Sequence, residues 1–167
     1  SDLLAMLGVN GSTVSTDNVA IGSQSLYSIT TGANNIAIGS QSLLSNTTAS
    51  SNTAVGYQAL YSNTTAQFNV AVGQGALFSN TTADANTAVG REALYANTTG
   101  LYNSSLGFGS LNSNTTGNSN SSFGFASLDA NTTGSNNSAF GFQALASNTT
   151  ASNNTRSEEH TSELQSH

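Results

Sequence analysis

The sequence predicts an all-β fold, a parallel β-solenoid of eight 17-residue coils. Three observations predict it: glycines recur every 17 residues, leucines recur at the same interval, and an Asn and a Thr-Thr pair keep fixed places between them. The phase holds without insertion or deletion from Asn18 to Asn153. Because low-complexity disorder does not keep such columns, each unit is expected to be one module stacked on its neighbours.

The repeat is too short for most other solenoids. Its consensus is N-x-[AS]-[VILF]-G-x-x-[AS]-L-x-[SA]-N-T-T-[GA]-x-x. A helical hairpin repeat usually needs more than about 30 residues and a leucine-rich repeat at least about 20. Seventeen residues suit one coil of two or three short strands joined by turns.

The elements of one coil follow in order. Asn52 to Val55 predicts a short strand that ends at Gly56, since glycine tolerates strained turn conformations. Tyr57 to Tyr61 fits either a second strand or a single helical turn, because periodicity cannot separate the two over five residues. Ser62 to Thr65 predicts a turn, since Asn and Thr side chains bond their own backbone.

Stacking predicts the core. Equivalent residues of successive coils would lie about 4.8 Å apart and form ladders, so eight coils would make a rod of roughly 40 Å. Asn ladders would bond amide to amide along the stack, and the Ala/Ser columns would let the walls approach closely. The expected core is the Leu column together with one apolar column: Ile21, Ile38, Val55, Val72, Val89, Leu106, Phe123 and Phe140.

This core is thin. Two large apolar side chains per coil contribute about 1.5–3 kcal/mol each on burial, whereas ordering the backbone costs about 1–2 kcal/mol per residue. A homo-oligomer would add burial. Two aromatic columns are therefore either oligomer faces or caps on the coil edges, and both readings stay open: Tyr27, Tyr61, Phe78 and Tyr95, and Phe108, Phe125 and Phe142.

The sequence divides the chain into three parts. Residues 1–17 are expected to be an N-terminal cap or the end of an upstream segment, and residues 18–155 are the solenoid. Residues 156–167 lose the phase at once; they are either a polar cap or foreign, and R-S-E-E-H-T-S-E-L-Q-S-H resembles a translated sequencing-library adaptor. That resemblance implies a non-native, disordered tail. It implies no role for the residues His160, His167, Glu158, Glu159 and Glu163.

Composition excludes several function classes. The net charge is -6 with only two Lys+Arg and no Cys, which argues against a nucleic-acid surface and excludes thiol chemistry and cysteine metal sites. No apolar run approaches the roughly 20 residues of a membrane span. The ionisable side chains outside the tail are scattered: Asp2, Asp17, Asp84, Arg91, Glu92 and Asp129. We therefore expect no enzyme and no catalytic, cofactor-binding or metal-binding residue.

The Asn-Thr-Thr motif has two further readings. Each copy, such as Asn46-Thr47-Thr48, is formally an N-glycosylation acceptor, but the fixed period favours a turn ladder. Regular Thr columns also suggest an ice-binding face as an alternative function. Adjacent Thr residues in a strand would point to opposite sides, which argues against that face.

The units N-V-A-I-G-S-Q-S-L (Asn18 to Leu26) and N-T-A-V-G-Y-Q-A-L (Asn52 to Leu60) resemble two groups of repeats. One is the shaft of phage tail fibres, and the other is the β-roll head of trimeric autotransporter adhesins. Both resemblances imply a homotrimer on a virion or a bacterial surface. They also imply attachment to a cell-surface glycan or protein receptor, and no catalysis.

Overall fold

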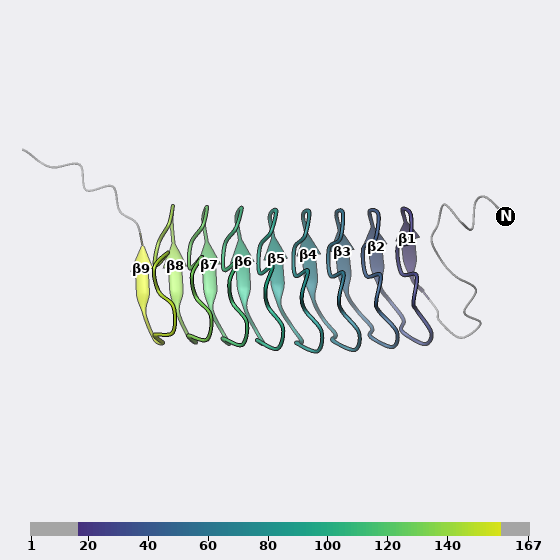
Figure 1. Ribbon diagram of the computed structural model, residues 1–167. Helices are drawn as coiled ribbons and strands as arrows, with labels where there is room; N and C mark the ends of the chain where they lie inside the picture. The colour runs from purple at the N-terminus through teal and green to yellow at the C-terminus, as the bar shows by residue number, and fades with distance from the viewer. Residues whose placement is uncertain (1–16, 158–167) are drawn as a thin grey trace, which may run out of the picture.

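The computed structural model describes residues 17–157 and has the predicted solenoid architecture (Figure 1). Within these residues, three-residue strands pair in parallel in one sheet, in chain order, with no helix. Each strand pairs with the strand 17 residues further on, so that Ala54 lies opposite Ala71. The strands are β1 (Val19–Ile21), β2 (Ile36–Ile38), β3 (Thr53–Val55), β4 (Val70–Val72), β5 (Thr87–Val89), β6 (Ser104–Leu106), β7 (Ser121–Phe123), β8 (Ser138–Phe140) and β9 (Thr155–Ser157).

The last strand includes Arg156 and Ser157, which lie beyond the predicted end of the repeat at residue 155. Residues 1–16 and 158–167, which hold most of the predicted N-terminal segment and tail, lie outside the described residues. We number the positions of each coil 1 to 17 from its opening Asn.

Each coil contains one strand, and the stretch from Tyr57 to Tyr61 is a series of turns, neither a second strand nor a helical turn. Gln58 and Leu60 have positive φ angles of 57° and 52°. Their N–H groups still bond along the stack, to the carbonyls of Ser40 and Ala76 at 3.0 Å. Like the sheet, this stretch of turns is therefore hydrogen-bonded to its equivalents in neighbouring coils, although two of its residues have left-handed backbone conformations.

One predicted core column is wrong. The Leu column is fully buried from Leu26 to Leu128, but Ile21 is 49% and Phe140 45% exposed. A three-residue strand alternates its side chains, and the inward place belongs to the central Ala or Ser, such as the fully buried Ala54. The flanking apolar residues at positions 2 and 4 therefore point outward.

Two asparagine files complete the interior, at positions 1 and 12. The Nδ2 of Asn97 donates to Asn80 Oδ1 and to the Gly100 carbonyl, each at 3.0 Å. Asn86 Nδ2 donates to the same carbonyl at 2.9 Å, which closes its coil. No buried side-chain nitrogen or oxygen among the described residues lacks a partner. The predicted amide ladders are confirmed, and they fill space that the sequence assigned to apolar side chains.

The Gly at position 5 is required by geometry. Gly90 has a φ of 134°, where L side chains are strained, and a Cβ there would collide with the Gly107 carbonyl of the next coil. The positive φ agrees with the strained turn expected at this Gly. The direct contact between the backbones of neighbouring coils at this column was not predicted from the sequence.

Candidate interaction surfaces

The outward-facing strand residues form an apolar stripe along the stack. In the coils of β1 to β5 it consists of the Val and Ile residues at positions 2 and 4. In the coils of β6 to β8 position 2 is Ser, and the stripe consists of positions 4 and 6. We call this set the outer stripe: Val19, Ile21, Ile36, Ile38, Val55, Val70, Val72, Val89, Leu106, Phe108, Phe123, Phe125, Phe140 and Phe142. Every member is half-buried or exposed.

The C-terminal part of the outer stripe is a double file of aromatic rings. Phe108, Phe125 and Phe142 stack along the axis with centroids 5.4 and 5.3 Å apart. Phe123 and Phe140 stack beside them, at 5.3 Å and an interplanar angle of 1°. Each ring therefore has one or both faces against a neighbouring ring, and every one of these residues remains partly exposed.

The second aromatic column lies at position 10. Tyr61, Phe78 and Tyr95 stack with centroids 5.0 Å apart and rings 7° from parallel. The position 6 column and three of the four members of the position 10 column therefore form ring stacks that bridge coils. Tyr27 stands outside its stack, because Leu44 occupies position 10 of the next coil. In such stacks a ring of one coil packs against the ring of the next coil, and the exposed part of each ring can contact a partner.

The two Thr of each turn have different environments. At position 13 the hydroxyl donates to the next coil, as from Thr98 Oγ1 to the Thr115 carbonyl at 3.0 Å. The Thr at position 14 is exposed in every coil. This single exposed file consists of Thr31, Thr48, Thr65, Thr82, Thr99, Thr116, Thr133 and Thr150.

The asparagine of the N-T-T motif is closed to modification in the folded coil. From Asn46 to Asn131 it is fully buried, and its amide bonds within the stack, as described for Asn97. The reading of this motif as a turn ladder is confirmed.

The ionisable residues stay dispersed. The Arg91 guanidinium lies 2.9 Å from Glu92 and 5.4 Å from the centroid of the Phe108 ring. Asp84 accepts the backbone N–H of Gln67 at 2.7 Å. Burial raises the pKa of Asp129 above its ordinary value. No cluster of three metal-ligating side chains occurs within residues 17–157. Asp2, His160 and His167, which the sequence predicts to form no site, lie outside the described residues.

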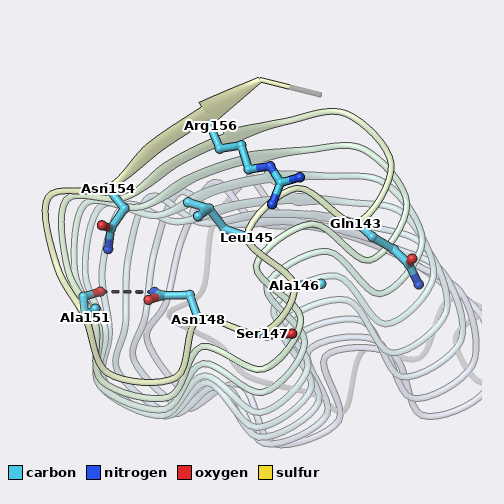
Figure 2. Close-up of a pocket in the computed structure, with 8 residues that line it drawn as sticks. All are labelled: Gln143, Leu145, Ala146, Ser147, Asn148, Ala151, Asn154 and Arg156. Carbon is cyan, nitrogen blue, oxygen red and sulfur yellow. Dashed lines mark hydrogen bonds between the residues drawn. The ribbon is translucent and has the colours of Figure 1, made fainter. Parts of the chain in front are cut away.

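A cavity of about 430 Å³ opens at the C-terminal end of the stack (Figure 2). Leu145, Asn148, Asn154 and Arg156 point into it, and Asn148 Nδ2 bonds the Ala151 carbonyl at 3.0 Å. Gln143, Ala146 and Ser147 complete its lining.

Sequence reasoning missed this cavity and the outward direction of the outer stripe. The stripe had a usable signal, since apolar columns flank a column of Ala or Ser at period 2. The cavity had none beyond the loss of phase at Arg156.

Comparison with protein families, with curated proteins and with solved structures found no significant match. Within the described residues, no helix is long and apolar enough to span a bilayer.

Proposed function

We propose that this chain is a shaft segment of a homotrimeric fibrous protein that attaches a virion or a bacterium to a cell surface. A phage tail fibre is the first reading, on the sequence resemblance, and a bacterial adhesin is the second. The protein would be extracellular, without catalytic activity, cofactor, nucleic-acid partner or membrane insertion.

The outer stripe is the observation that carries this proposal. Large contiguous apolar patches on a protein surface mark interaction sites. The stripe extends through every coil from β1 to β8, so a partner that covers it must be as long and as repetitive as the stack itself. A parallel copy of the same chain meets that requirement, because identical residues then lie at the same height.

The role of such a rod is mechanical and multivalent. Coil-to-coil hydrogen bonds make the stack a stiff spacer between an anchor and a tip. Its remaining faces are rich in Ser, Thr and Asn, which suit hydrogen bonding to a glycan or a protein receptor. Repetition of one weak site along a rod raises the overall affinity without any new contact.

The assembly is tested by light scattering on a sizing column, with circular dichroism on the same peak. We expect three times the 16.9 kDa of one chain, and a β-type spectrum. Ile38→Asp and Phe140→Asp place charges in the outer stripe and should lower the mass to that of one chain. The matched control Thr48→Asp lies in the exposed Thr file and should leave the mass unchanged. A wild-type chain that elutes folded at 16.9 kDa would overturn the trimer.

Attachment is tested separately on a glycan array and on whole cells, with the intact trimer as probe. Binding that is lost with trimer dissociation supports the receptor role. A blank array together with no cell binding would reduce the function to that of a spacer.

The exposed Thr file keeps ice binding as the second candidate. It is a single file, whereas Thr at alternating positions of a strand would give two files on one face. Hexagonal shaping of ice crystals on a cold-stage microscope would favour ice binding, and round discs would remove it.

A further inference from the structure

Two residues that line the C-terminal cavity, Leu145 and Asn148, occupy positions that are buried in the coils before them. Leu128 and Asn131 are fully buried by the coil above them. Their equivalents one coil later, Leu145 and Asn148, line the open cavity and are only partly buried. The cavity is therefore an interior without its next layer.

The backbone hydrogen bonds show what that layer must supply. Leu128, Ala130 and Thr132 donate their N–H groups to the carbonyls of the following coil, at 2.9, 3.1 and 2.7 Å. The same donors of the last coil belong to Leu145, Ser147 and Thr149, and no described residue accepts them.

The side-chain amides at position 12 also lack their next partner at this end of the described chain. Asn148 Nδ2 donates to Asn131 Oδ1 at 3.0 Å, which continues the position 12 file to its last member. Its own Oδ1 lacks a donor among residues 17–157, where in earlier coils such as that of Asn114 the next Asn supplies one. The end thus presents three N–H donors and an amide acceptor around Leu145.

We propose that this end is a docking surface for one further coil of the same repeat, joined to Thr155. The occupant is fixed by chemistry: carbonyls at positions 8, 10 and 13, a Leu at position 9 and an Asn at position 12. The backbone register of its first strand is already set, because β9 pairs in register with β8. Asn154 also continues the position 1 file, with its Nδ2 3.1 Å from Asn137 Oδ1.

Arg156 marks where the present sequence departs from that occupant. It lies opposite Ala139, at the inward place of the strand, and its side chain extends over the cavity (Figure 2). Ala139 is fully buried at the equivalent place. A closed coil would enclose the guanidinium in a lumen sized for a methyl group, and moving such a charge out of water is costly. The occupant must therefore carry Ala or Ser there.

The test replaces residues 156–167 with a copy of Ala54 to Phe68, which completes a coil after Asn154 and Thr155. Hydrogen exchange at the amides of Leu145, Ser147 and Thr149 is compared with that of the 167-residue chain. Once these groups bond to a seated coil, exchange should slow by about 100-fold or more, and the thermal midpoint should rise.

Two matched controls carry the same added length, one with Leu60→Asp and one with Ala54→Arg in the copied coil. Neither should protect the three amides. Unchanged exchange with the unaltered copy, or equal protection from either control, would overturn the proposal. Protection of the 167-residue chain that grows with its concentration would show that a second copy occupies the end, and would overturn it too.

Discussion

The lumen and the outer stripe of this solenoid follow different rules. Inside, position 9 is Leu in every coil and position 1 is Asn in every coil. Outside, the stripe changes from Val and Ile at positions 2 and 4 to Phe at positions 4 and 6. Inside, each residue must satisfy the coil above and the coil below. Outside, a residue needs only a similar neighbour, so the composition drifts gradually along the rod. The lumen residues therefore stabilise the single chain, whereas the outer stripe is the surface that a partner would contact.

The largest effect should come from Gly90→Val, which strikes the backbone contact behind the lumen. The new Cβ collides with the Gly107 carbonyl at a φ of 134°, so we expect a loss of at least about 4 kcal/mol, in the range of diagnostic substitutions. Thermal unfolding followed by circular dichroism measures it.

The control for this position is Gly109→Gln. Gly109 has a φ of 61° with open space around its Cβ position, and Gln58 occupies the equivalent place with a φ of 57°. We expect a loss of only about 1 kcal/mol, the usual cost of a side chain in this backbone region. Equal losses for both variants would contradict the distinction between the two glycine positions.

Next in size is Asn97→Leu, which keeps the number and branching of the side-chain heavy atoms and removes the hydrogen bonds. Asn80 Oδ1 loses its donor, at about 1–3 kcal/mol for a buried group. The Gly100 carbonyl loses one of its two donors and keeps the other. The thermal midpoint should fall clearly. The same change at Asn112, where an earlier coil carries Leu44, should have a small effect, and a similar fall there would show that the amide file contributes little.

A smaller effect is expected on the outer stripe from Phe125→Ala. It removes two ring stacks, to Phe108 and to Phe142, worth about 0.5–1.5 kcal/mol each. Tyr57→Ala truncates a ring at the same coil position between Ser40 and Gln74, and should cost less. A larger loss at Tyr57 would mean that stacking along the stripe does not stabilise the single chain.

The smallest effect is expected from Asp129→Asn. Because burial raises the pKa of Asp129 in the folded chain, the folded state binds its proton more tightly than the unfolded state does. The ionised carboxyl destabilises the folded chain. Stability should therefore be complete below the unfolded pKa of Asp129 and should fall as the pH rises through its folded pKa. Because solvent screens this partly exposed carboxyl, the variant should be only slightly more stable at pH 7 and unchanged at pH 2. A pH-independent difference would contradict this cause.

The architecture and the ladders were predictable because the period is visible in the residues themselves. The direction of the position 4 column was not recognised, because size and hydropathy were weighed above the alternation around the central Ala. Ser105 and Ser122 give an example of contacts that the repeat pattern alone does not predict. Each pairs across the lumen with a Ser five residues on, as Ser105 Oγ does with the Ser110 carbonyl at 2.8 Å and with its hydroxyl. Such pairs follow only once the two walls are known to face each other.

The interaction surfaces were harder to predict, since they depend on how coils end and stack. The ring stacks of Phe108 and Phe125 required the coil spacing and the rotamers. The exposed environment of Thr99, against the bonded hydroxyl of Thr98, required the path of the turn. The end cavity required the last layer to be seen in place.

The two asparagine files give the rod a direction. Every amide-to-amide bond among them donates from a coil to the coil before it, as from Asn114 to Asn97 and from Asn120 to Asn103. Their dipoles therefore add along the axis instead of cancelling, and aligned bonds in a low-dielectric interior polarise one another. A second stack that approached the C-terminal end in the opposite orientation would place its amide oxygen against Asn148 Oδ1, and no hydrogen bond could form. New coils can therefore add to such a rod in one orientation only, and this orientation is set by side chains that carry no net charge.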